Sequence, residues 1–260
     1  MEPCGESMPG RPVAPMGPGV PVLRVIPGGG GRLFATGRVL AYGEAMAILY
    51  RAELTPSKQE IVTAWLARQS WSGVAAGDSI EMIGAYRFDD PDEKIGIETH
   101  LVQRSDGTVL HVPLTYRDAA VAGAEEHLAG EMEHSVLGHR WIYDATGDPV
   151  YAAALAWTIV RGQAGADQFR DIDGTLVLQP NTVVVHGFGD HSATAPAITT
   201  AAPSIAEEPG MGPVTTITTD GPALAVYRTP QVASDDDGHE GQLTGRWDGL
   251  GNALLLAALA

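Results

Sequence analysis

The clearest structural signal in this chain is IGIETHLVQRSDGTVLHVPLTYR, residues 95–117. Two runs rich in β-branched and aromatic residues flank the tripeptide Ser105-Asp106-Gly107. An Asp-Gly pair between two such runs is a strong signal for a tight turn that joins antiparallel strands. The stretch therefore predicts a β-hairpin, in which His111 is expected to be a half-exposed side chain of the second strand.

Upstream of the hairpin, the sequence predicts two strands and a helix. The strands are expected over AILYRAEL (47–54) and EMIGAYRF (81–88). Between them, Thr55 is expected to cap a helix that has Pro56 in its first turn. Apolar residues then recur at helical spacing and should bury one stripe of this helix; they are Ile61, Val62, Trp65 and Leu66.

Downstream, the sequence predicts two more helices. The run AEEHLAGEMEHSV (124–136) can form a short helix. Residues 138–144 read as a turn that enters a short extended segment. Asp148 and Pro149 then supply the cap and first turn of an alanine-rich helix, which is expected to end near Gly162 or Gly165.

After about residue 170 the pattern changes to short strands and turns. Six runs read as strands: GTLVLQP (174–180), NTVVVHGF (181–188), PVTTITTD (213–220), PALAVYRT (222–229), GQLTGRW (241–247) and NALLLAALA (252–260). Strands, then helices, then strands, without βαβ alternation, indicate an α+β fold with antiparallel β-sheets and a few helices.

The bulk composition limits the partners and the compartment. The 260 residues carry a formal charge of −16 at pH 7, which repels nucleic acid and anionic membranes. No apolar run reaches the roughly 18 residues that a membrane span needs. Cys4 is the single cysteine, so an intrachain disulfide and a cysteine-based zinc site are excluded. We expect a cytoplasmic protein with neither a nucleic-acid nor a membrane partner.

Composition also divides the chain into three parts. Residues 1–45 hold seven prolines and ten glycines. Such a segment buries too little apolar surface to offset its chain entropy, so we predict a disordered tail and hypothesise that Met46 is the natural start. Residues 46–165 are expected to form one domain, and residues 166–260 a β-rich subdomain.

The segment before the alanine-rich helix offers a possible metal site. If residues 124–135 are helical, His127, Glu131 and His134 share one face and could bind a divalent metal. The set is not the H-E-x-x-H pattern, and no neighbour is an obvious general base. A solvated polar helix face is the preferred interpretation, so we predict neither a metal site nor catalytic residues.

The adjoining residues are interpreted as a structural anchor. Trp141 would fill a pocket and an Arg–Asp pair, Arg140 with Asp144, would join two loops. The functional alternative is a sugar stacked on Trp141. The full set of candidates for binding or anchoring is Glu133, His134, Arg140, Trp141, Tyr143 and Asp144.

The segment HGFGDHSA, residues 186–193, can be compared with the H-G-D-x-x-x-x-N loop of aminoglycoside-type kinases. In that loop the aspartate activates the acceptor hydroxyl and the asparagine holds magnesium. Here Phe188 follows the His-Gly pair, Asp190 falls two places late, and no asparagine follows at the required spacing. We interpret the segment as a mobile glycine-rich turn.

Several segments together resemble the maltokinase N-terminal cap domain, as found in small, mostly actinobacterial proteins that are sometimes labelled 1,4-α-glucan branching proteins. These segments are MAILYRAELTPSKQEIVTAWLARQSW (46–71), YRFDDPDEKIGIE (86–98), HVPLTYRDAAVAGAEEHLAGEMEHSVLGHRWIYDATGDPVY (111–151) and LTGRW (243–247). The resemblance covers most of residues 46–260 in order, and the long central motif is its most specific part.

The resemblance implies a fold like the cap and β-rich part of a kinase-like N-terminal lobe. Full maltokinases add a helical lobe with the catalytic loop, and they phosphorylate maltose with ATP and magnesium, which links trehalose to α-glucan synthesis. We find no counterpart here for the catalytic aspartate and magnesium ligands of that lobe, so the activity is not carried over.

Three functions follow as expectations. The first is a stand-alone, non-catalytic cap-like module that binds a protein partner, such as an enzyme of the glucan pathway, and needs no cofactor. The second is a sugar-kinase-related protein or subunit, completed by another chain, that phosphorylates maltose or an amino sugar with ATP and Mg²⁺. The third is a small carbohydrate-binding protein for an α-glucan or maltose-type ligand.

Overall fold

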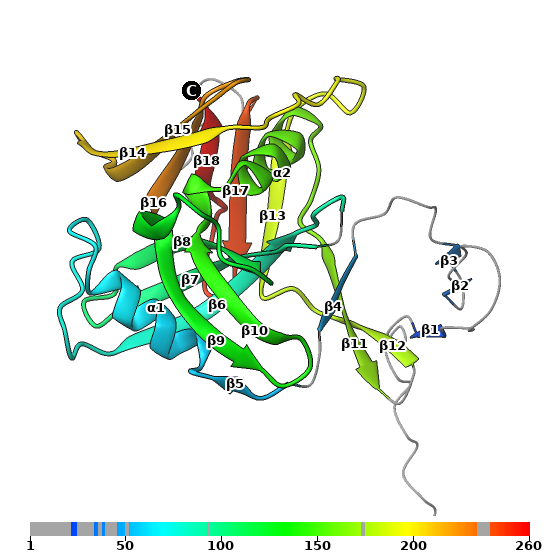
Figure 1. Cartoon of the computed structure of the whole chain (residues 1–260). Coiled ribbons are helices and arrows are strands. Elements are labelled where there is room, and N and C mark those ends of the chain that lie inside the picture. The colour runs from blue at the N-terminus through cyan, green and yellow to red at the C-terminus, as the bar shows by residue number, and fades with distance from the viewer. Residues whose placement is uncertain are drawn as a thin grey trace, which may run out of the picture.

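The computed structural model describes residues 22–24, 34–35, 38–39, 46–49, 52–92, 94–172, 175–232 and 240–260. In this part of the chain, three six-stranded sheets are accompanied by two α-helices (Figure 1). The α+β prediction with antiparallel sheets is confirmed at this level. The expected disorder of residues 1–45 lies outside the described residues, apart from three short strands.

The first sheet has the strand order β3-β2-β1-β12-β11-β4. Its strands are β1 (Val22–Arg24), β2 (Phe34–Ala35), β3 (Arg38–Val39), β4 (Met46–Leu49), β11 (Asp167–Ile172) and β12 (Thr175–Gln179). Neighbouring strands are antiparallel except for β4 and β11, which pair in parallel. The expected strand over 47–54 is therefore divided, because its end belongs to the next sheet.

The second sheet, called the central sheet below, has the order β5-β9-β10-β8-β7-β6. Its strands are β5 (Leu54–Thr55), β6 (Ile80–Phe88), β7 (Gly96–Arg104), β8 (Val109–Arg117), β9 (Leu128–His134) and β10 (Gly138–Asp144). All its pairs are antiparallel. The predicted hairpin is confirmed as β7–β8, and Gly107 adopts the positive φ of 86° that its tight turn requires.

The third sheet, called the C-terminal sheet, has the order β13-β17-β18-β16-β15-β14. Its strands are β13 (Val183–Phe188), β14 (Ala201–Glu208), β15 (Gly212–Thr219), β16 (Leu224–Val232), β17 (Gln242–Trp247) and β18 (Leu254–Leu259). All six strands predicted after residue 170 are confirmed, five of them in this sheet and one as β12. The sequence did not predict β11 or β14.

Helix α1 (Lys58–Leu66) begins two residues later than expected. Its cap is Ser57, whose side chain accepts from the main-chain N–H of Glu60 while the Glu60 carboxylate accepts from the Ser57 N–H. This reciprocal capping box satisfies two N–H groups that the first helical turn leaves unpaired. The predicted cap, Thr55, is instead part of β5.

Helix α2 (Pro149–Val160) begins as predicted, with Asp148 as the cap and Pro149 in the first turn. The other predicted helix, over 124–136, is wrong. Its residues form a short 3₁₀ turn, Glu125–His127, and then strand β9. The alanines and glutamates favour a helix locally. However, β9 pairs with β5 on one side and with β10 on the other, which satisfies its main-chain groups and overrides that weak preference.

Two hydrophobic cores lie on opposite faces of the central sheet. The smaller core lies under α1, where Trp65 and Leu66 are almost fully buried; each buried side chain of this size contributes roughly 1.5–3 kcal/mol. The larger core joins the other face of the central sheet to α2 and the C-terminal sheet. It draws on residues from both sides of position 165, while the division into domains at that position stays a prediction.

Neither helix in the described part of the chain is long and apolar enough to cross a membrane.

Candidate functional site

The hairpin β9–β10 places four polar and aromatic side chains on one face of the central sheet. His139 lies opposite Glu133, and Trp141 lies opposite Glu131. Because side chains alternate between faces along each strand, these four point to the same side. The two glutamates are exposed, and His139 and Trp141 are half-buried.

His139 is held between the two carboxylates. Its Nδ1 lies 2.7 Å from Glu133 Oε1, and its Nε2 lies 2.9 Å from Glu131 Oε2. A carboxylate can only accept, so both ring nitrogens must carry a proton for both bonds to form. The hydrogen bonds to Glu133 and Glu131 accordingly raise the pKa of His139. Trp141 packs edge-to-face on this imidazole, with ring centroids 4.3 Å apart.

His139 was not among the predicted site residues, although it lies within the quoted segment. The sequence separations to Glu133 and Glu131 are six and eight residues. These separations bring side chains together across a hairpin and not on a helix. The signal was therefore hidden by the wrong helix prediction over 124–136.

The candidate metal ligands are not brought together. Glu131 and His134 are three residues apart on a strand, so their side chains leave opposite faces of the sheet. His127 lies in the preceding 3₁₀ turn, where its ring packs against Gly147. Among the described residues, no group of three His, Cys, Asp or Glu side chains could hold a metal ion.

The remaining anchor candidates make separate local contacts. Arg140 donates to the Leu137 carbonyl oxygen at 2.7 Å. Tyr143 is buried, and its hydroxyl oxygen accepts from the Val121 N–H at 2.9 Å. His134 Nδ1 accepts from the main-chain N–H of Leu137 at 3.0 Å, within the turn of the hairpin. The Arg140 and His134 contacts lie within the hairpin and its turn, and the Tyr143 contact ties β10 to the loop between β8 and β9.

Asp144 pairs with a residue far away in the chain. Its Oδ2 accepts from Arg228 Nη2 at 2.6 Å, while its Oδ1 accepts from both the N–H and the hydroxyl of Thr146. Arg228 is 2% exposed and also donates to the Thr215 hydroxyl at 2.7 Å. The guanidinium lies over the Trp71 ring, 4.8 Å from its centroid. This buried pair joins the central sheet to the C-terminal sheet.

A second, partly buried ion pair connects β8 to the start of α2. Arg117 donates twice to Asp148, from Nε to Oδ2 and from Nη2 to Oδ1, both at 2.8 Å. The Thr115 hydroxyl adds a third bond to the same carboxylate at 2.9 Å. Asp148 also caps α2 by accepting from the Val150 N–H. One carboxylate therefore fixes both the start of the helix and its position on the sheet.

His111 of β8 lies between the central sheet and the C-terminal sheet. It is fully buried, so the prediction that it is half-exposed is wrong. Its Nδ1 lies 3.1 Å from the Tyr227 carbonyl oxygen, which can only accept. Nδ1 therefore carries the proton, and Nε2 accepts from the Tyr86 hydroxyl at 2.8 Å. Burial, together with the nearby charge of Arg228, lowers the pKa of His111 to about 3.

A polar cluster lies under the first turn of α1. Glu98 accepts from the Lys58 ammonium and, at 3.1 Å, from Arg87 Nη2. His100 lies beside it and shares a 2.9 Å hydrogen bond with the Tyr116 hydroxyl. Burial opposes the charge of Glu98, but Arg87 and Lys58 outweigh it and hold the Glu98 pKa well below its usual range. Burial lowers the pKa of His100 to about 4.

The cluster therefore keeps a fixed charge pattern near neutral pH. Glu98 stays ionised and His100 stays neutral, so neither is ready to exchange a proton with a substrate in that range. The Lys58–Glu98 pair also ties the start of α1 to the central sheet. The arrangement suits a rigid scaffold.

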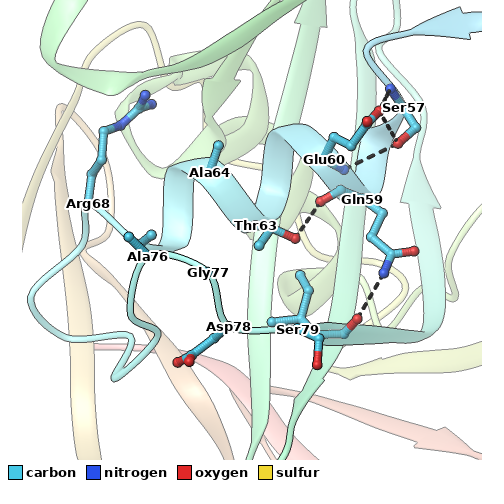
Figure 2. Close-up of a pocket in the computed structure, with 12 residues that line it drawn as sticks. Ser57, Gln59, Glu60, Thr63, Ala64, Arg68, Ala76, Gly77, Asp78 and Ser79 are labelled. Carbon is cyan, nitrogen blue, oxygen red and sulfur yellow. Dashed lines mark hydrogen bonds between the residues drawn. The ribbon is translucent and has the colours of Figure 1, made fainter.

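A surface groove of about 910 Å³ runs between α1 and the loop before β6 (Figure 2). Its polar side chains are partly used by the fold. Gln59 donates to the Ile80 carbonyl oxygen at 2.9 Å, and Asp78 accepts from the Ala75 N–H. Arg68, at one end, donates to the Ala129 carbonyl oxygen at 2.9 Å. The lining includes no aromatic side chain, and no sequence pattern predicted this groove.

The glycine-rich segment 186–193 packs closely on the end of α2. A Cβ on Gly187 would lie 2.1 Å from the Thr158 carbonyl oxygen, and one on Gly189 would lie 2.2 Å from that of Val160. Asp190 accepts from the N–H and the hydroxyl of Ser192. The glycines are thus needed for close approach to the helix as well as for a turn.

One known protein family matches part of this chain. Residues 65–148 match the family model described as the maltokinase N-terminal cap domain. The match runs from within α1, through β6–β10, to the cap of α2. The predicted resemblance to this family is therefore confirmed over residues 65–148. No curated protein matches the chain.

Proposed function

We propose that this chain is a non-catalytic binding module that docks onto a protein of the α-glucan pathway. The observation that carries the proposal is the C-terminal sheet, which is fixed to the central sheet by a buried ion pair and whose edge strand β14 pairs, among the described residues, with β15 alone. Rigid elements joined in this way can present a binding surface without losing conformational entropy on contact.

The charges inside the chain support a scaffold role. Glu98, Asp144 and Asp148 are buried, and each is committed to a lysine or an arginine. The cap family adds the pathway, because full maltokinases carry this domain as an accessory to a separate kinase lobe. By this proposal, the cap and its attached sheet act here through contact with another chain.

Light scattering after size exclusion tests the proposal with purified components. The chain is mixed in turn with a maltokinase, a trehalose synthase and a glycogen branching enzyme from its source. We expect one mixture to give a particle whose mass equals the sum of the two proteins. If none of the three forms such a complex at micromolar concentration, the proposed pathway contact is wrong.

The same mixtures test the kinase-subunit alternative. ATP, Mg²⁺ and either maltose or glucosamine are added, and sugar phosphate is measured. A non-catalytic module predicts that the chain alone forms no product and that it supplies no activity that the partner lacks. Product formed only when both chains are present would favour the phosphotransferase subunit.

Carbohydrate binding is a second candidate because of the hairpin surface. Trp141 lies beside His139 with the carboxylates of Glu131 and Glu133 at its rim, and an aromatic ring surrounded by polar groups can take a sugar. Titration with maltose, maltotetraose and glycogen, followed by tryptophan fluorescence, tests it. A response lost in Trp141→Ala and kept in Trp157→Ala, on α2, would establish this site. No response in the unmodified chain would remove it.

A further inference from the structure

The two edges of the C-terminal sheet differ in how well they are covered. Strand β13 forms one edge, and His186 there bridges to Ala164 while the Gly187 N–H donates to the Gln163 carbonyl oxygen at 2.8 Å. Strand β14 forms the other edge. Among the described residues, β14 pairs with β15 alone. One edge is therefore partly covered by main-chain contacts, whereas β14, although it lies near the 3₁₀ turn Ala145–Gly147, pairs with no further strand of the described residues.

The open edge belongs to a ribbon that extends beyond the sheet. All eight residues of β14 pair with β15, from Ala201 opposite Thr219 to Glu208 opposite Gly212. By contrast, β15 pairs with β16 only over residues 214–217. Figure 1 shows β14 and β15 running outward past the rest of the sheet. An exposed edge of this kind presents unpaired main-chain groups that a further strand can use.

Apolar side chains accompany these main-chain groups. Ile205 in β14 is 43% exposed, Met211 in the adjoining turn is 46% exposed, and Val232 at the end of β16 is 82% exposed. Gln231 donates to the Met211 carbonyl oxygen at 2.8 Å, which holds the turn against the end of β16. Exposed apolar groups next to an open edge favour a partner that covers both.

The charge near β14 indicates which kind of partner can pair with this strand. The ribbon ends in Glu207 and Glu208, both exposed, and the whole chain carries a formal charge of −16. A second copy brings the same acidic tip and the same net charge, so pairing between two copies is opposed by repulsion. Basic side chains on an incoming strand would instead be attracted to the tip.

We propose that β14 is a docking edge for an extended, basic segment of a partner protein that alternates apolar and Lys or Arg side chains. This inference rests on the proposed function and names the surface and the chemistry of its partner. Pro203 has no N–H to donate, so the main-chain pairing falls on residues 204–208. The apolar side chains of the segment cover Ile205 on one face of the ribbon, and its basic side chains lie on the opposite face, beside Glu208.

A labelled peptide tests the edge on the full chain. Fluorescein-labelled Lys-Val-Lys-Val-Lys-Val-Lys-Val is titrated at physiological salt and followed by fluorescence anisotropy, with a Lys-Ser peptide of equal length and charge as control. We expect the Lys-Val peptide to bind roughly ten-fold more tightly, which corresponds to about 1.4 kcal/mol. Equal binding of both peptides would mean non-specific attraction to an acidic protein and would overturn the inference.

Two charge-matched variants locate the contact. Ile205→Lys on β14 and Val184→Lys on β13 each replace one exposed apolar residue and change the net charge equally; Val184 is 60% exposed. We expect Ile205→Lys to weaken binding of the Lys-Val peptide roughly ten-fold and Val184→Lys to leave it unchanged. Circular dichroism checks that both fold. Equal losses in the two variants would overturn the inference.

Failure of the β14 docking edge can be distinguished from failure of the proposed function. A pathway protein that still forms its complex with Ile205→Lys would overturn the edge and leave the proposed function standing. Peptide binding at β14 with no pathway complex would overturn the proposed function and leave the docking edge standing. A homodimer that Ile205→Lys dissociates would overturn the inference by identifying a second copy as the occupant.

Discussion

Arg228 Nη2 lies 2.6 Å from Asp144 Oδ2, and this pair joins residues 84 positions apart in the chain. Asp144 ends β10 of the central sheet, and Arg228 lies in β16 of the C-terminal sheet. Arg228 is fully buried, and its Nη1 has no hydrogen-bond partner among the described residues. The guanidinium therefore depends heavily on the carboxylate of Asp144 for its neutralisation.

Removing the Asp144 carboxylate should strongly destabilise the folded protein. We expect Asp144→Ala to lower the free energy of unfolding by about 3–5 kcal/mol, because it leaves a buried cation unpaired. Asp92→Ala is the matched control, since Asp92 pairs with Lys94 where both side chains are more than 70% exposed; it should change stability by less than about 1 kcal/mol. Urea unfolding measures both. Similar small losses would show that the buried pair does not hold the sheets together.

The shared core predicts that residues 46–165 do not fold on their own. Tyr86 and Leu101 of the central sheet pack in the same core as Ile217 and Val226 of the C-terminal sheet. A fragment of residues 46–165 should therefore expose much of this core and lack a cooperative thermal transition, because an uncovered apolar face destabilises it. A fragment that unfolds as sharply as the full chain would instead support an independent domain with a boundary near residue 165.

Burial of His111 predicts a dependence of stability on pH. The folded protein keeps this imidazole neutral, with a pKa of about 3, while an unfolded chain protonates it near its usual value of 6.5. Between these values the unfolded state binds more protons, so stability falls as pH falls from about 6.5 towards 3. His100, with a pKa of about 4, adds a loss of the same sign over part of that range.

Replacing His111 should remove part of this slope. In His111→Asn we expect lower stability at pH 7 and a slope that is smaller by up to about 1.4 kcal/mol per pH unit between pH 4.5 and 6. His186→Asn is the control, because His186 is exposed on β13. Urea unfolding across this range measures both slopes. An unchanged slope in His111→Asn would mean that His111 is protonated in the folded protein.

Close packing of the 186–193 segment on α2 gives a further prediction. Gly187→Ala should lower stability by about 1–3 kcal/mol, since its methyl group would meet the Thr158 carbonyl oxygen and force the main chain to shift. Gly251→Ala, where nothing lies within 4 Å of the added Cβ, should have little effect. Thermal unfolding compares them. Equal melting temperatures would show that the segment is free to move away from the helix.

Local signals explain which elements could be predicted. The Asp-Gly turn predicts β7–β8, and Asp148 with Pro149 predicts the start of α2, because each depends on neighbouring residues. Strand β9 was missed because its residues favour a helix until β5 and β10 pair with it. The contact of His139 with Glu131 was not predicted for the same reason. The Asp144–Arg228 pair joins two sheets, and no local pattern in the sequence indicates which distant arginine Asp144 meets.

Hydrogen exchange of the β14 amides tests the binding module at its proposed contact. The full chain is measured alone and with saturating Lys-Val peptide or with the pathway protein that forms a complex. Pairing at the open edge predicts slower exchange of amides within residues 204–208 and unchanged exchange in β13. Unchanged exchange in β14 under saturation, or protection found only at another surface, would contradict docking at this edge.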